Sequence, residues 1–273
     1  MRRRLTRLSA SLLAWSMLAA CGGASFAPTP GPPTVSGSTS PPAPRSTSAS
    51  PAPTPSAIPS LTPVGLFGRI LLRVPTSAHV VALTFDAGAN ADGVPAILAA
   101  LRARHIAATF FLTGTFVRQY PALSRQMAAA GAVGDHTVTH AHLTTLTDGK
   151  IRQEVLGART EIIATTGRDP RPFFRFPYGE SSRHTLSLVN ALGFVAVGWT
   201  VDSLGWMGTS GGITVASVVS RVVAARTPGE IVLMHVGSNP NDHSALDAAA
   251  LPTVIAHLAA LGYEFVTLDM LLR

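Results

Sequence analysis

The chain has 273 residues, of which 47% are hydrophobic and 13% are charged, and its formal net charge is +7. Four arginines lie within the first seven residues, and without them the net charge is +3. Because the other basic residues form no cluster, the composition argues against a nucleic-acid-binding function.

Residues 1–21 have the pattern of an export signal. The arginines are followed by an apolar run from Leu8 to Ala20, which is too short and too close to the terminus for an ordinary membrane-spanning helix. The last four residues, LAAC, resemble a bacterial lipobox, which implies that Cys21, the only cysteine, is lipidated. We therefore expect an exported lipoprotein anchored to the outer face of the cell membrane, with a secreted protein as the alternative.

Residues 22–63 have the composition of a disordered linker. They contain twelve of the 21 prolines, and Ser, Thr, Ala and Gly make up most of the rest. Such a segment buries too little apolar area to offset the entropy lost on ordering it. We interpret it as a tether, which leaves residues 64–273 for one folded catalytic domain.

From His79 onward, short apolar runs alternate with longer amphipathic runs. The short runs predict strands at 79–85, 107–113, 132–136, 172–176, 194–199, 230–235 and 263–268. The longer runs predict helices at 92–104, 115–130, 147–166, 184–191, 213–226 and 245–261. This alternation is typical of parallel strands joined by right-handed crossovers, in either a barrel or an open doubly wound sheet. Periodicity alone does not separate these two α/β folds.

Five polar residues lie at or just after the ends of predicted strands. They are Asp86, His136, Arg175, Asp202 and His235. Active sites of parallel α/β folds gather at this edge of the sheet. The sequence therefore predicts one site, built from strands that are far apart along the chain.

Five short motifs contain these residues. They read TFDAG at 84–88, HTVTH at 136–140, RFPYG at 175–179, DSLGW at 202–206 and LMH at 233–235. In this order they resemble the motifs of the polysaccharide deacetylases of carbohydrate esterase family 4. The resemblance extends over roughly residues 78–270 and implies the fold of that family, a distorted seven-stranded (β/α) barrel.

In this family the first motif supplies two carboxylates. The resemblance implies that Asp86 is the general base and that Arg175 pairs with it and orients it. The second carboxylate is a metal ligand in the family, and this chain has Ala87 in its place. A turn or cap carboxylate is the alternative interpretation of Asp86.

His136 and His140 are spaced i, i+4, which on a helical turn directs two imidazoles toward one divalent metal ion. The resemblance implies the same pair as metal ligands and zinc as the metal, with cobalt or another divalent metal as alternatives. The third ligand is open, and the candidates are Asp135, Asn90, Asp86 itself or water.

The resemblance places three further groups around a scissile acetamide. The backbone N–H of Tyr178, in the turn after Pro177, helps to hold the oxyanion. His235 acts as the general acid, and Leu233 lines the pocket for the acetyl methyl group. A structural turn and a histidine at the rim of the core are the alternative interpretations.

The fourth motif departs from the family pattern. The family commonly has Asp at the position of Gly205, where the carboxylate tunes the histidine acid. The sequence therefore predicts an altered pKa or a different partner for His235. Asp202 and Trp206 keep their places in the motif. We expect both, and Pro177 of the third motif, to contact substrate at the pocket, with Trp206 as one wall.

These roles predict the hydrolysis of N-acetyl groups on an amino-sugar polymer. For an exported, tethered enzyme the first expected substrate is GlcNAc or MurNAc in peptidoglycan, or a related extracellular glycan, and no protein partner is predicted. The losses at Ala87 and Gly205 favour an alternative, a deacetylase-like protein that binds glycan without turnover. A glycosidase that uses Asp86 and Asp202 as its two carboxylates leaves the histidines unexplained.

Overall fold

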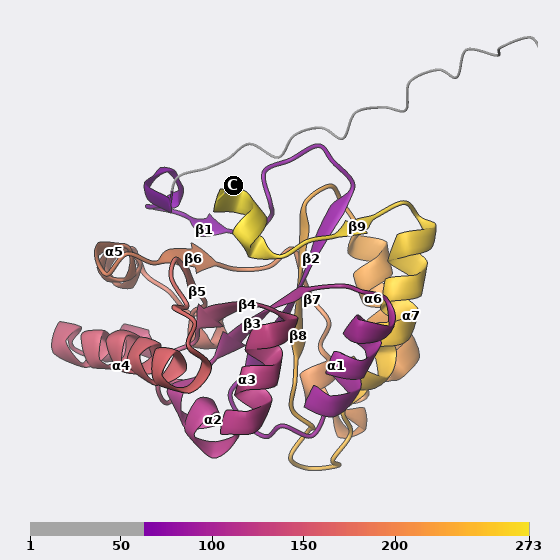
Figure 1. The fold of residues 1–273 in the computed structure, drawn as a ribbon, viewed down its shortest axis with the longest axis horizontal. Helices are drawn as coiled ribbons and strands as arrows, with labels where there is room; N and C mark the ends of the chain where they lie inside the picture. The colour runs from indigo at the N-terminus through magenta and orange to yellow at the C-terminus, as the bar shows by residue number, and fades with distance from the viewer. Residues whose placement is uncertain (1–62, 273) are drawn as a thin grey trace, which may run out of the picture. The chain divides into compact units, whose positions relative to one another are not determined.

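The fold is built on one largely parallel sheet, which the computed structural model describes within residues 63–272 (Figure 1). Its nine strands are β1 (Ile70–Leu71), β2 (Val80–Ala87), β3 (Ala108–Leu112), β4 (Gly131–Asp135), β5 (Phe173–Phe174), β6 (Val195–Val197), β7 (Val201–Asp202), β8 (Glu230–His235) and β9 (Glu264–Phe265). Each of the seven predicted strands forms. The two-residue strands β1 and β7 are additions that the sequence pattern does not predict.

The sheet curls so that its two sides are linked. The strand order is β1-β6-β5-β4-β3-β2-β8-β7, and β9 pairs with β2. β6 and β7 belong to one segment, 195–202, which pairs through β6 with β5 and through β7 with β8. An antiparallel bridge between Arg73 and Glu230 adds a second link. The predicted α/β fold, a distorted barrel, is therefore confirmed, and the open doubly wound alternative is not adopted.

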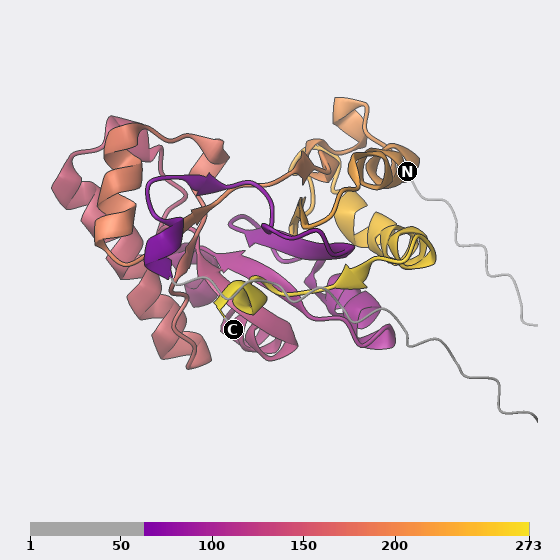
Figure 2. The same cartoon turned by 90° about the horizontal axis from the view of Figure 1, so that it is seen from above.

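Helices surround the curled sheet. They are α1 (Val94–Ala103), α2 (Gly114–Gln119), α3 (Pro121–Ala130), α4 (Asp148–Thr166), α5 (Arg183–Ala191), α6 (Val215–Ala225) and α7 (Leu246–Ala260). Figures 1 and 2 show α4 and α5 at the end of the curled sheet that carries β5 and β6, and α1, α6 and α7 at the opposite end. The predicted helix 115–130 is wrong as a single element, because Pro121 has no N–H to donate and starts a new helix after Tyr120.

Strand β2 lies in the core and is buried on both faces. All eight of its residues are buried. Val81, Leu83 and Phe85 belong to the apolar cluster that includes buried residues of α1 and α7, whereas Val80 and Ala82 belong to a second cluster. Full burial of each large apolar side chain contributes roughly 1.5–3 kcal/mol. This packing fixes the strand whose last residues enter the candidate site, and it explains the nearly continuous apolar run in the sequence.

Two expectations concern parts of the chain outside this description. The predicted signal at 1–21 and all but the last residue of the predicted linker at 22–63 lie outside the described residues. Within residues 63–272, none of the helices combines the length and the apolar character needed to cross a membrane.

Candidate active site

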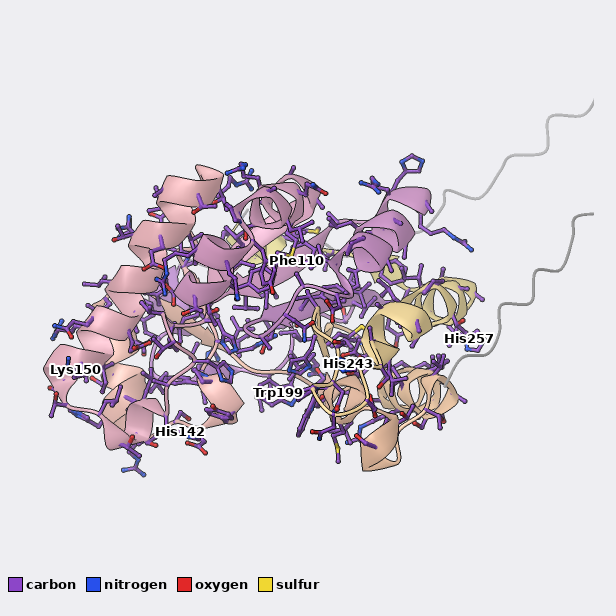
Figure 3. The ribbon with its side chains drawn as sticks, turned by 90° about the horizontal axis from the view of Figure 1, so that it is seen from below. Phe110, His142, Lys150, Trp199, His243 and His257 are labelled. Carbon is purple, nitrogen blue, oxygen red and sulfur yellow. The ribbon has the colours of Figure 1, made fainter. Side chains whose placement is uncertain are left out.

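A pocket of about 530 Å³ lies where the parallel strands end. Its lining consists of Asp86, Gly88, Ala89, His136, His140, Phe176, Tyr178, Trp199, Asp202, Trp206, Leu233, His235, Gly237, Ser238 and Pro240. Figure 3 places Trp199 near the centre of its view, between the side of α4, which carries Lys150, and the side of α7, which carries His257. The structure therefore brings eight of the predicted site residues together in one pocket.

Asp86 lies at the end of β2 and is held by an ion pair. Its Oδ1 accepts a hydrogen bond from Nη1 of Arg175 at 2.7 Å, and its Oδ2 lies 3.4 Å from Nε2 of His136. Burial raises the pKa of Asp86, but the charge of Arg175, followed by the histidines, outweighs burial and holds that pKa below its usual range. Asp86 is therefore ionised at neutral pH and can accept a proton.

Arg175 is fully buried beneath the pocket, so its own placement is fixed. Its Nη2 donates to the carbonyl of Gly198 at 3.0 Å, and its guanidinium carbon lies 4.1 Å from the centre of the Phe111 ring. A planar guanidinium can make these contacts and still present a donor to a carboxylate. The chain supports the Asp86 side chain through this rigid arginine.

His136 and His140 face the same pocket as neutral imidazoles. Nδ1 of His136 lies 2.9 Å from the carbonyl oxygen of Arg175, and because a carbonyl only accepts, Nδ1 carries the proton and Nε2 is free. The two rings are 4.7 Å apart between centroids. Burial lowers the pKa of His136, and burial lowers the pKa of His140 to about 4, aided by His136.

The i, i+4 spacing of this pair does not reflect a helical turn, because residues 136–140 form a loop. Thr137 and His140 have φ angles of 67° and 61°, in the left-handed region. The Thr137 hydroxyl accepts a hydrogen bond from the backbone N–H of His140 at 3.0 Å, and Glu154 on α4 accepts from Thr139. Local hydrogen bonds thus bring the imidazoles together where the spacing suggested a helix.

Two of the predicted candidates for a third metal ligand, Asn90 and Asp135, do not line the pocket. Oδ1 of Asn90 accepts from the backbone N–H of Ser238 at 2.8 Å, and its Nδ2 donates to the Ser238 carbonyl. Asp135 is fully buried, and its Oδ1 accepts from the N–H of Thr137 at 2.9 Å. Ala87 packs in an apolar cluster. Among residues 63–272, no group of three or more His, Cys, Asp or Glu side chains is placed to hold a metal ion.

Two aromatic rings frame the pocket. Tyr178 is 56% exposed, with a φ of 58°, and its ring stacks on His142 at 4.0 Å between centroids. Trp206 is 49% exposed, and its indole N–H donates to Oδ2 of Asp202 at 3.3 Å. Pro177, predicted to contact substrate, is buried at the start of the turn and does not line the pocket.

His235 ends β8 and lies beside a carboxylate that belongs to none of the five motifs. The backbone N–H of His235 donates to Oδ2 of Asp247 at 2.8 Å, and the same oxygen lies 3.8 Å from the ring Nδ1. Burial lowers the pKa of His235, but the nearby carboxylates, that of Asp247 first, raise it above its usual value. His235 is therefore suited to carry a proton.

Several functional positions have weak sequence signals. Phe176 and Trp199 are the last residues of predicted strands, and Ser238 and Pro240 follow the predicted strand 230–235, but no pattern in the sequence marks these four as pocket residues. Asp247 has a clearer signal, since it is the only carboxylate in the predicted helix 245–261. A single acid in an otherwise apolar helix is costly to bury without a partner, so its position is informative.

Comparisons with known proteins agree with the motifs. A family model described as polysaccharide deacetylase matches residues 73–197. The chain is 30% identical over 200 residues to a peptidoglycan-N-acetylglucosamine deacetylase of Bacillus cereus, covering 73% of this chain and 70% of that one. It is 36% identical over 200 residues to a chitooligosaccharide deacetylase of Bradyrhizobium sp., covering 70% of this chain and 90% of the relative.

A similar solved structure is a CE4 family pseudoenzyme from Bacillus anthracis. The two superpose with a TM-score of 0.70 at 27% identity, covering 79% of this chain and 73% of that one. A mutant of that protein, described as a pseudoenzyme with restored enzymatic activity, also superposes with a TM-score of 0.70, at 28% identity, and covers 79% of this chain and 75% of its own.

Proposed function

This chain belongs to the polysaccharide deacetylase family, and we propose that it hydrolyses N-acetyl groups on an amino-sugar polymer. One observation carries the proposal. The base candidate Asp86 and the acid candidate His235 are directly opposite each other in the paired strands β2 and β8, and both line the same pocket. A base and an acid whose pKa values are shifted apart are what amide hydrolysis at neutral pH requires.

The two groups divide the proton transfers. Asp86 accepts a proton from a water molecule as the water oxygen attacks the acetamide carbonyl carbon. The carbon–nitrogen bond then breaks, and His235 gives its proton to the departing amine. The backbone N–H of Tyr178 is the proposed donor to the oxyanion that forms between these steps. The products are acetate and a free amino sugar.

The pocket does not provide a complete set of ligands for the metal ion that the family resemblance implies. Catalytic zinc sites use three protein ligands and keep one position for water or substrate. This pocket offers His136 and His140, and Asp135 and Asn90 do not line it. The remaining candidate, Asp86, is paired with Arg175 and is the proposed base. The donor set therefore does not fit a strongly held resident metal, and the steps above do not pass through one. Dependence on zinc or cobalt stays a prediction.

The proposed substrate is peptidoglycan, at GlcNAc or MurNAc, or a related extracellular glycan. The relative of Bacillus cereus is a peptidoglycan-N-acetylglucosamine deacetylase, which supports this choice. The half-exposed rings of Tyr178 and Trp206 offer flat apolar faces on which sugar rings can pack.

We also propose that the protein is exported and lipidated at Cys21. Replacing Cys21 by serine tests this, because the Cys21→Ser variant should be lost from the membrane fraction of the cell. Unchanged fractionation of the variant would contradict the lipid anchor.

Acetate release tests the proposed function. The purified protein is incubated with peptidoglycan, with N-acetylglucosamine oligomers and with an O-acetylated glycan, with and without added zinc or cobalt. We expect release from the N-acetylated substrates, and a fall in kcat of about 100-fold or more in Asp86→Asn, which keeps the shape and removes the base. Equal release by the variant would contradict the role of Asp86.

A second candidate function is glycan binding without turnover. The incomplete ligand set and the structural similarity to a pseudoenzyme of Bacillus anthracis favour it. Against it, an ionised Asp86 and a proton-carrying His235 are both kept in the pocket at a cost in desolvation. Glycan binding with no acetate release from any substrate would favour the binder.

A further inference from the structure

Asp247 is a buried carboxylate directed at His235. It lies in the first turn of α7, and its side chain is 3% exposed. Its Oδ2 accepts the backbone N–H of His235 at 2.8 Å and lies 3.8 Å from Nδ1 of the ring. This last distance is that of an ion pair, not of a hydrogen bond. One carboxylate thus holds the end of β8 and faces one edge of the imidazole.

Gly205 leaves the space that this carboxylate occupies. Gly205 is buried at the start of the short 3-10 helix η4 (Gly205–Met207). A Cβ atom added at Gly205 would overlap both oxygens and the carboxyl carbon of Asp247. Position 205 and position 247 therefore compete for one space beside His235, and only one of them can place a carboxylate there.

The position of Asp247 at the N-terminus of a helix does not by itself explain why this carboxylate is buried. An acid in the first turn of a helix gains about 0.3–1 kcal/mol from the helix dipole, whereas burying a carboxylate costs several kcal/mol unless it is paired. Asp148, in the first turn of α4, is the exposed counterpart and pairs with His184 at the surface. Within residues 63–272, the one ion pair that Asp247 makes is with His235.

We propose that Asp247 is the positioning residue of His235, and that Gly205 is required because a larger side chain would displace it. Asp247 supplies from α7 the carboxylate that the fourth motif lacks. With Nδ1 facing Asp247, Nε2 is the ring nitrogen left for the pocket, where His235 meets the departing amine. This proposal rests on the proposed deacetylase function, in which His235 is the general acid.

Other charged groups face His235 and remain when Asp247 is changed. They are Asp86 on β2 and Asp202 on β7. The titratable rings of His136 and His140 line the same pocket, and the Trp206 ring lies 6.4 Å from the imidazole between centroids. Asp86 must act as the base, and Asp202 accepts hydrogen bonds from Leu204 and Trp206. Removing the charge of Asp247 should therefore lower the pKa of His235, while Asp86 and Asp202 continue to stabilise its protonated form.

The first test is Asp247→Asn, which keeps the shape and removes the charge. We expect kcat for acetate release to fall by about tenfold or more, with little change in KM. The alkaline limb of the kcat profile should move to lower pH, because His235 loses its proton more easily. Asp148→Asn, the same change in the first turn of another helix, should leave both unchanged. An unshifted alkaline limb in Asp247→Asn would overturn the proposal.

The second test moves the carboxylate between the two positions. Asp247→Gly should lose activity, and Gly205→Asp should lose activity and stability because the two carboxylates collide. The double variant Gly205→Asp/Asp247→Gly should regain at least about tenfold in kcat over Asp247→Gly. Gly205→Asn/Asp247→Gly fills the same space without charge and should regain stability alone. Failure of the first double variant, or equal rescue by the second, contradicts a role for the carboxylate.

A third measurement separates this proposal from the proposed function. The pKa of the His235 ring is followed by NMR in the full chain and in Asp247→Asn, with no substrate present. We expect a lower pKa in the variant, even if the wild-type protein releases no acetate from any substrate. An unchanged pKa would overturn the pairing, whatever the activity.

Discussion

The Asp86–Arg175 ion pair is the residue-scale feature on which the site depends. Arg175→Met leaves a buried carboxylate without its partner, which should destabilise the protein by about 3 kcal/mol at pH 7. The pKa of Asp86 should rise, so the acid limb of kcat/KM should move to higher pH. Urea denaturation and a pH–rate profile measure the two effects.

The sign of the pH dependence follows from the lowered pKa of Asp86. The pair stabilises the fold above the unfolded-state pKa of about 3.9, and this stability is lost as pH falls through the lower folded-state pKa. The stability difference between wild type and Arg175→Met should therefore shrink in acid. Adding Asp86→Asn should recover part of the loss, and a constant difference at all pH values would contradict the assignment.

Glu230 is a second buried acid, far from the reaction, and it affects stability alone. Both of its oxygens are buried without a hydrogen-bond partner within residues 63–272, and burial raises its pKa to about 7, against a lowering by Arg226. Because the folded-state pKa is the higher one, stability should fall as pH rises from about 4.5 to above 7.

Glu230→Gln tests this dependence. The variant should gain up to about 3 kcal/mol over wild type at pH 8 and little at pH 4.5, as measured by urea denaturation. Glu264→Gln, at an exposed position of β9, is the matched control and should show no such difference. Equal effects of Glu230→Gln at both pH values would show that Glu230 is not a protonated buried acid.

The affinity of the site for a metal ion also depends on single residues. Ala87→Asp restores a carboxylate next to Asp86, and we expect zinc to bind at least about tenfold more tightly, by isothermal titration calorimetry. Ala87→Asn is the control, with similar size and no charge. Unchanged affinity in Ala87→Asp would mean that its side chain stays with Leu83 and Phe85 in the apolar cluster.

At the scale of elements, helix α4 offers two glycines with opposite expected effects. Gly149 lies within the first turn and Gly167 is the left-handed C-cap, with a φ of 72°, and a Cβ at either position meets nothing within 4 Å. Gly149→Ala should stabilise the protein by about 0.5–1 kcal/mol, whereas Gly167→Ala should destabilise it by about 1–2 kcal/mol. Urea denaturation measures both, and effects of the same sign would contradict this description of α4.

Elements with long periodic runs could be predicted from the sequence. Features that depend on one or two residues, such as a helix break, a loop or a two-residue strand, could not. Strand β2 and helix α4 lie within one or two residues of their predicted bounds. The break at Tyr120 depends on Pro121 starting a helix, and the loop of His136 and His140 depends on left-handed backbone angles. Two-residue strands such as β1 and β7 have no periodicity to detect.

At the scale of the whole described fold, the barrel determines which residues meet. Motif order predicted Asp86, His136 and His235 at one pocket, because parallel strands end at a common edge. Asp247 could not be placed in the same way, since its helix gives no register relative to β8. Segment 195–202 links β5 to β8 and so closes the sheet toward a barrel. The alternation of strands and helices in the sequence does not predict this link.

The central claim is that this pocket turns over glycan and does not merely bind it. The most direct test measures binding and acetate release on the same peptidoglycan fragment, for the wild-type protein and Asp86→Asn. We predict similar Kd values for the two proteins and acetate release by the wild type alone, with one free amine formed per acetate. Binding by both proteins with no acetate from either, with or without added zinc, would contradict the claim and identify a glycan-binding protein.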